Sequence, residues 1–138
     1  MLKHKLGITR KEHFNAAHRL HNPNWSLEKN KKVFGKCNNP NFHGHNYDLE
    51  VTIIGEIDID TGYVIDTKKL SRYIKEEILD PFDHKNLNLE VPEFTELNPT
   101  VENIAIVIYN RLEKVIPNNL EIKIKLYETP RNFVEYPY

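Results

Sequence analysis

Apolar and polar side chains alternate along several segments of the chain. The alternation is most regular in residues 43–56 and recurs in residues 120–126, and residues 6–18 show it less regularly. A period of two is typical of a strand that buries one face, so we expect these three segments to form antiparallel strands. A turn sequence at 60–62 precedes residues 63–65, which we expect to form a short additional strand.

Two other segments repeat their apolar side chains with helical spacing. In residues 70–78 the apolar side chains recur every three or four positions, which places them on one face of a helix. Asp66 or Thr67 can cap the start of this helix, and Pro81 is expected to end it.

A second and stronger apolar stripe runs through residues 101–116. Either polar residue of Asn98-Pro99-Thr100 can cap this helix, and Pro117 closes it. The order of elements predicts an α+β fold, with a four-stranded antiparallel sheet and two helices on one face. Long strands leave open edges on such a small sheet, and these edges are often paired with another subunit, so we expect an oligomer.

The composition narrows the class of protein. The 138 residues carry 19 Lys+Arg and 20 Asp+Glu, a formal charge of −1, which gives no general case for nucleic-acid or membrane-surface binding. The length suits one domain over residues 1–138, and no segment approaches the roughly 20 apolar residues of a membrane span. A single cysteine excludes an intrachain disulfide and a four-thiolate zinc site, so we expect a cytoplasmic protein.

Residues 22–41 show little periodicity and contain Pro23, Gly35, Pro40 and six asparagines. We interpret this segment as a long loop. A compact domain seldom keeps such a loop unless the loop is functional or disordered, so it is the first indication of a site.

Three histidines lie where they can meet. His43 and His45 are two positions apart at the start of a predicted strand, so their side chains lie on one face. His18 ends the strand before the loop and joins them if residues 6–18 pair antiparallel with residues 43–56. Three imidazoles leave zinc a fourth position for water or substrate. Satisfied or surface histidines remain an alternative interpretation at this point.

The lone cysteine, Cys37, lies in the loop six residues before His43. A free cysteine is often simply a small buried residue. The polar surroundings and the adjacent lysine favour a reactive thiol instead, which makes Cys37 a candidate base or nucleophile. Several lysines of the loop either form a solvated surface or suit a phosphorylated substrate. These are Lys29, Lys31, Lys32 and Lys36.

Three acidic positions complete the candidate chemistry. Glu128 extends the apolar row of residues 120–126, so a carboxylate stands where a buried side chain is expected, unless the strand has already ended. Such a carboxylate can accept two hydrogen bonds from a planar N–H edge. Asp83-His84 is either a proton-transfer pair or a turn, and Glu102 is most simply a partner of the helix dipole.

Taken together, these segments resemble the 6-pyruvoyl-tetrahydropterin synthase family. The resemblance runs in order from about His13 to Tyr136. Its most specific motifs are Phe14-Asn15-Ala16-Ala17-His18-Arg19-Leu20, Phe34-Gly35-Lys36-Cys37-Asn38-Asn39-Pro40-Asn41, His43-Gly44-His45-Asn46-Tyr47, Asp83-His84-Lys85-Asn86-Leu87, Pro99-Thr100-Val101-Glu102-Asn103 and Tyr127-Glu128-Thr129.

The resemblance implies a tunnelling fold, in which subunits join their sheets into a barrel and two trimers stack as a hexamer. It implies zinc on His18, His43 and His45, Cys37 as the catalytic base, and Asp83 with His84 as a second proton relay near the thiol of a neighbouring subunit. Glu128 would anchor the pterin, with Thr100 and Glu102 on the same side. The implied reaction converts 7,8-dihydroneopterin triphosphate to 6-pyruvoyl-tetrahydropterin with loss of triphosphate.

Other functions stay open on the sequence alone. A queuosine-pathway branch of the family, 6-carboxy-tetrahydropterin synthase, typically has three residues between the cysteine and His-Gly-His, whereas five intervene here, as in the pyruvoyl branch. Phe42 stands where glycine is common and can alter the loop. A non-catalytic pterin-binding protein and an α+β domain with incidental histidines are the remaining alternatives.

Overall fold

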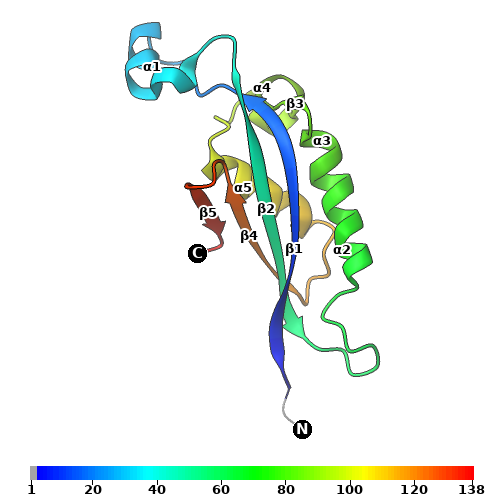
Figure 1. The fold of residues 1–138 in the computed structure, drawn as a ribbon. Coiled ribbons are helices and arrows are strands. Elements are labelled where there is room, and N and C mark those ends of the chain that lie inside the picture. The colour runs from blue at the N-terminus through cyan, green and yellow to red at the C-terminus, as the bar shows by residue number, and fades with distance from the viewer. Residues whose placement is uncertain (1–2) are drawn as a thin grey trace.

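A long β-hairpin forms the centre of the structure, a computed structural model that describes residues 3–138 (Figure 1). Its arms are β1 (Lys5–His18) and β2 (His43–Glu56), which pair antiparallel along their whole length. The register sets His18 opposite His43. Two of the three strands predicted from alternation are therefore confirmed, together with the pairing on which the three-histidine site depends.

Three further strands complete the sheet. β4 (Glu121–Tyr127) pairs antiparallel with β2, and β5 (Phe133–Tyr136) pairs antiparallel with β4. β3 (Lys85–Asn86) pairs in parallel with β1, which gives the order β3-β1-β2-β4-β5. The predicted four-stranded antiparallel sheet is therefore wrong in count and in kind, because the sheet is five-stranded and mixed.

The predicted strand at 63–65 does not form. The carboxylate of Asp58 accepts hydrogen bonds from the backbone N–H groups of Asp60 and Thr61, both over 2.9 Å, and closes a tight local turn. The Asp58 N–H then donates to the carbonyl of Tyr63 over 2.8 Å. Both edges of β2 are already paired, with β1 and β4, so the segment cannot add to that strand.

The first predicted helix is longer than expected and continues through its proline. It comprises α2 (Thr67–Ile74), the π-helix η2 (Lys75–Leu79) and α3 (Asp80–Phe82), and Asp66 caps its start by accepting from the N–H of Lys68. The expectation that Pro81 ends the helix is therefore wrong.

The structure shows how Pro81 is accommodated inside a helix. A proline has no N–H, so the carbonyl four residues earlier, that of Glu77, loses its usual donor. The guanidinium of Arg111 supplies one instead, from Nη1 over 3.1 Å. Arg111 is held in place by two hydrogen bonds of 2.7 Å to the carboxylate of Glu93.

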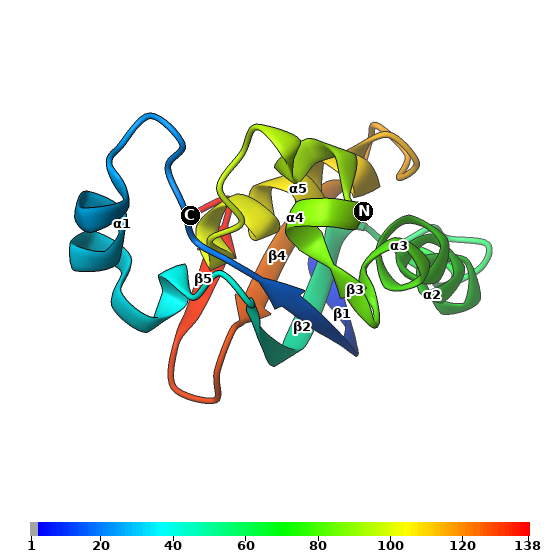
Figure 2. The same cartoon turned by 90° about the horizontal axis from the view of Figure 1, so that it is seen from above.

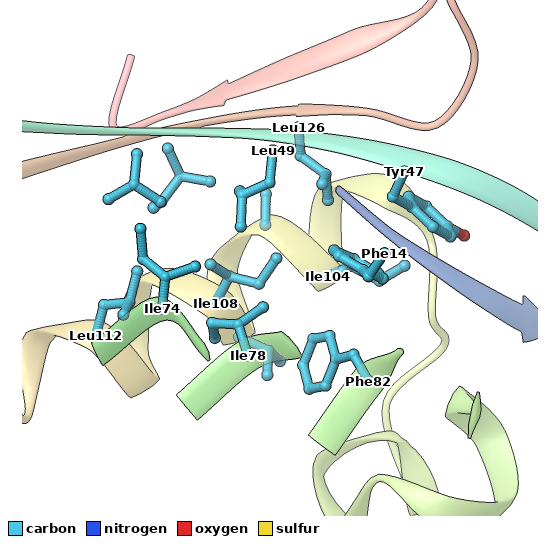
Figure 3. Packing of buried hydrophobic residues seen from close by; sticks show 14 of the residues in the cluster. Phe14, Tyr47, Leu49, Ile74, Ile78, Phe82, Ile104, Ile108, Leu112 and Leu126 are labelled. Atoms are coloured by element: carbon cyan, nitrogen blue, oxygen red, sulfur yellow. The ribbon is translucent and has the colours of Figure 1, made fainter. Parts of the chain in front are cut away.

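The second predicted helix is α5 (Val101–Glu113), capped by the Thr100 hydroxyl, which accepts from the N–H of Asn103. Helices α2, α3 and α5 cover one face of the sheet, and Figure 3 shows their apolar side chains meeting those of the strands. Two short helices, α4 (Leu87–Glu90) and η3 (Pro92–Thr95), link α3 to α5. No helix within residues 3–138 combines the length and apolar character needed to cross a membrane.

The segment predicted as a loop contains α1 (Leu27–Phe34) and the 3-10 helix η1 (Gly35–Asn38). Ser26 caps the start of α1, because its hydroxyl accepts from the N–H of Lys29. The buried side-chain amide of Asn30 fixes the segment that leads into this helix. Its oxygen accepts from the N–H of Asn22, and its nitrogen donates to the carbonyl of Asn22. Figures 1 and 2 show α1 standing apart from the other helices, beyond the hairpin end that carries His18 and His43.

Candidate metal and catalytic site

Three histidines converge at the end of the central hairpin. His18 ends β1, His43 begins β2 directly opposite it, and His45 lies two residues further on the same face. One ring nitrogen from each histidine lies within 4.8 Å of the others. The sequence predicted this convergence from strand parity together with an assumed antiparallel pairing, which the structure confirms.

His18 is buried and its ring is fixed. Its Nδ1 lies 2.7 Å from the carbonyl oxygen of Pro99 and 3.3 Å from the hydroxyl of Tyr47. A carbonyl only accepts, so Nδ1 carries the proton and Nε2 keeps its lone pair. This arrangement is the one by which proteins orient an imidazole toward a metal.

Several ring nitrogens of the cluster have no protein partner. Both nitrogens of His43 and Nε2 of His45 are buried and make no hydrogen bond within residues 3–138. Buried polar atoms cost free energy unless a ligand satisfies them. One ring nitrogen from each of His18, His43 and His45 forms a donor set that fits a divalent cation.

Burial also favours the neutral, metal-binding form of His18 and His43. Burial is the main cause that lowers the pKa of His18 to about 4, and the nearby His43 and His45 lower it further. Burial, with His45 adding to it, likewise lowers the pKa of His43. Neutral rings at pH 7 need no proton displaced before they coordinate.

Glu128 lies beside this centre. Strand β4 ends at Tyr127, so the strand does stop before Glu128. The carboxylate still lies on the buried side, about a quarter exposed, with Oε2 3.9 Å from Nε2 of His18. The turn that follows holds it there, since the Glu128 N–H donates to the carbonyl of Asn132 over 3.1 Å.

Cys37 lies in η1 and is half-buried. It lines a cavity of about 1100 Å³ together with His43 and His45. The carbonyl of Cys37 accepts from the N–H of Leu20 over 2.9 Å, and the side-chain amide of Asn38 donates to the carbonyl of Leu20 over 2.8 Å. These bonds fix the thiol segment against the end of β1.

Asp83 and His84 form a pair at a different place. One carboxylate oxygen of Asp83 lies 3.0 Å from Nδ1 of His84, and the other accepts from the N–H of Asn15, which lowers the pKa of Asp83. The His84 N–H donates to the carbonyl of the same Asn15 over 2.6 Å. The His84 backbone adopts a positive φ of 60°, and its side chain is 82% exposed. The pair does not line the cavity that Cys37 shares with the histidines.

Thr100 and Glu102 lie at the start of α5. The Thr100 hydroxyl caps the helix, and the Glu102 side chain is exposed in its first turn. Because Pro99 precedes them and contacts His18, this helix start adjoins the histidine centre.

Sequence reasoning missed two groups that orient the site. Tyr47 was counted only as an apolar residue, although its position on the face of His43 and His45 was a usable signal. The carbonyl of Pro99 belongs to the backbone, so no side-chain pattern could have revealed it.

The fold and this centre define the class: an α+β protein with three convergent histidines beside a cysteine-lined cavity. The model of the 6-pyruvoyl tetrahydropterin synthase family matches residues 7–137, and the chain belongs to that family. It is 48% identical over 129 residues to the 6-pyruvoyl tetrahydrobiopterin synthase of Homo sapiens, covering 94% of this chain and 89% of the human one.

Two further relatives are similar in structure or in sequence. The solved structure of Caenorhabditis elegans 6-pyruvoyl tetrahydropterin synthase superposes with a TM-score of 0.92 at 40% identity and covers 99% of this chain and 98% of its own. The 6-carboxy-5,6,7,8-tetrahydropterin synthase of Haemophilus influenzae is 36% identical over 123 residues, covering 74% of this chain and 84% of its own.

Proposed function

We propose that the chain is a carbon–oxygen lyase that converts 7,8-dihydroneopterin triphosphate to 6-pyruvoyl-tetrahydropterin and releases triphosphate. The observation that carries the proposal is the convergence of three histidines, two of which line the cavity that also holds Cys37. The family membership and the 48% identity to the human synthase support the same reaction. The reaction is internally redox-neutral, so it needs no nicotinamide. One domain over residues 1–138 carries it, in a reducing, cytoplasmic compartment that suits a free thiol.

His18, His43 and His45 are the residues that would hold Zn²⁺. When bound, the ion supplies Lewis acidity that makes the protons next to the substrate's hydroxyl groups easier to remove. Cys37 lines the same cavity and takes up such a proton as the base. Nδ1 of His18 stays protonated against Pro99, so this ring orients the site and does not serve as the base.

Glu128 anchors the pterin, with Thr100 and Glu102 on the same side of the site. A carboxylate can accept two hydrogen bonds from the planar N–H edge of a pterin. Oε2 of Glu128 lies 3.9 Å from Nε2 of His18, and Pro99 at the start of α5 contacts the same histidine, so these residues adjoin the histidine centre.

A neighbouring subunit completes the site. Asp83 and His84 form a hydrogen-bonded pair, yet they do not line the cavity of their own chain, and His84 is largely exposed. A relay built from them must serve a second copy. The open edges of the sheet support joining the subunits into a barrel of the tunnelling fold, as a trimer or a dimer of trimers.

The alternative activity is that of 6-carboxy-5,6,7,8-tetrahydropterin synthase. The similarity to the Haemophilus influenzae relative supports it, but at 36% identity this similarity is lower than that to the human synthase. A non-catalytic pterin-binding protein is disfavoured by the presence of Cys37, Asp83 and His84 together.

Product identification tests the proposal. Purified protein is incubated with 7,8-dihydroneopterin triphosphate, and the products are identified by chromatography and mass spectrometry. We expect 6-pyruvoyl-tetrahydropterin and triphosphate, with loss of both after chelation and recovery on adding Zn²⁺. Acetaldehyde and the 6-carboxy compound would establish the other branch, and binding without turnover would establish a pterin-binding protein.

A further inference from the structure

The cavity beside the histidines is strongly positive, although the chain as a whole is nearly neutral. Arg19, Lys31 and Lys36 line it together with Cys37, and no carboxylate within residues 3–138 contributes to its lining. The formal charge of the whole chain is −1. A cavity with cations and no acidic counterweight attracts a polyanion.

The two lysines are free to bind such an anion. Within the described chain, neither Lys31 nor Lys36 forms an ion pair, whereas Lys5, Lys75 and Lys123 each contact a carboxylate. Lys29, on the same helix, is engaged differently, because its ammonium lies 4.2 Å from the centre of the Trp25 ring.

Gly35 brings the two lysines to one cavity. It ends α1 with a positive φ of 57°, and its N–H donates to the carbonyl of Lys31. This backbone conformation is easy only for glycine, and it turns the chain directly from α1 into η1. Lys31, in the last turn of α1, and Lys36, in η1, therefore line the same cavity. Lys36 directly precedes Cys37.

Arg19 contributes a planar guanidinium to the cavity, and some of its hydrogen-bond donors are not used within the described residues. Its Nε donates to the carbonyl of Asn38 over 2.9 Å, which fixes the guanidinium beside the thiol segment. Its two terminal nitrogens make no hydrogen bond within residues 3–138. A guanidinium held in this way suits the paired oxygens of a phosphate.

We propose that Lys31, Lys36 and Arg19 bind the triphosphate group of the substrate; this assignment rests on the proposed function and adds the subsite that recognises the leaving group. The pterin lies toward α5, the hydroxylated side chain lies at the histidines, and its phosphorylated end enters the basic part of the cavity. These cations stabilise the negative charge that remains on the triphosphate when it departs.

The test compares two ligands that differ only in the triphosphate. Binding of neopterin and of neopterin triphosphate to the full chain, as purified with its metal, is followed by pterin fluorescence. We expect Lys31→Ala and Lys36→Ala each to weaken neopterin triphosphate about tenfold, the loss typical of a charged hydrogen-bonding partner. Neopterin itself should bind all variants within about twofold of wild type.

Lys32→Ala is the matched control. Lys32 is exposed next to Lys31 in the last turn of α1 but does not line the cavity. It removes the same charge from the same helix, so any loss that it shares with Lys31→Ala is a general charge effect. Circular dichroism of each variant shows that it is folded.

The outcomes separate the subsite from the function. Equal weakening of both ligands, or a loss for Lys32→Ala as large as for Lys31→Ala, would overturn the subsite. Absence of wild-type turnover of 7,8-dihydroneopterin triphosphate would overturn the proposed function by itself. The difference in affinity between the two ligands still measures the subsite in that case.

Discussion

The backbone carbonyl of Pro99 accepts a hydrogen bond of 2.7 Å from Nδ1 of His18. The bond joins the start of α5 to the end of β1, 81 residues earlier in the chain. It decides which nitrogen of His18 carries the proton, and it thereby aims Nε2 at His43 and His45. A contact between a helix start and a strand end therefore prepares the centre before any metal binds.

Removing one of the three imidazoles should remove the metal. We expect His45→Ala to lower the zinc content from about one ion per chain to near zero, because two imidazoles and water form a much weaker site. Elemental analysis after dialysis measures this. His13→Ala is the control, since His13 is exposed and belongs to none of the three ligand positions. Full zinc retention by His45→Ala would contradict the site.

Replacing the thiol should stop proton transfer and leave the metal in place. We expect Cys37→Ala to lower kcat by about 10²- to 10⁴-fold, the usual contribution of a general base. Zinc content and thermal stability should stay near wild type, because the contacts that hold this segment come from its backbone carbonyl and from Asn38. Undiminished turnover of Cys37→Ala would remove Cys37 from its assigned role.

The proposed relay from a neighbouring subunit can be tested by complementation. His84→Ala and Cys37→Ala should each be nearly inactive, for different reasons. If each site takes its thiol from one chain and its relay from another, oligomers dissociated and reassembled from an equal mixture should regain about a quarter of wild-type activity. A mixture as inactive as its two components would show that thiol and relay come from one chain. His84→Ala reassembled with itself is the control.

Acid should destabilise the metal-free protein. The folded chain keeps the pKa of His18 near 4, whereas an unfolded histidine titrates near 6.5, so only the unfolded state binds this proton between those values. The free energy of unfolding should therefore fall as the pH falls from about 6.5 to 4, by up to about 1.4 kcal/mol per pH unit. Urea unfolding of metal-free protein at several pH values measures the slope. His18→Gln should flatten the slope, and an equal slope in that variant would assign the effect to other groups.

Thr100 offers a way to separate capping from substrate binding. Thr100→Ala removes the hydroxyl that accepts from Asn103 and should cost about 1 kcal/mol of stability. Thr100→Ser keeps the cap and should stay close to wild type in thermal unfolding. If Thr100 also contacts the pterin through its hydroxyl, Thr100→Ala raises KM beyond what Thr100→Ser does at a temperature where both are folded. Equal KM values would leave Thr100 with the cap alone.

The central strands could be predicted from the sequence because the alternation of apolar and polar side chains is a local property. The alternation in residues 43–56 reproduced β2 from His43 to Glu56, and the antiparallel pairing with residues 6–18 placed His18 opposite His43. The alternative of satisfied or surface histidines is not what the structure shows, because three of the ring nitrogens are buried without a hydrogen-bond partner.

The failures have physical causes that a local pattern does not contain. Helix α1 is mostly polar, and the amide of Asn30, buried against Asn22, stabilises its approach through hydrogen bonds and not through an apolar stripe. Strand β3 is two residues long and exists because the backbone of Asn15 holds Asp83 and His84 beside β1.

The helical path through Pro81 has a consequence for how this chain can change. The carbonyl of Glu77 is satisfied by Arg111, which comes from another helix, so residues 81 and 111 are constrained jointly. A variant that loses the guanidinium leaves the partly buried carbonyl of Glu77 without its donor, whereas a variant that also replaces Pro81 regains a backbone N–H at that position. The effect of a substitution at residue 81 or 111 therefore depends on which residue occupies the other position, and the two sites are expected to be epistatic.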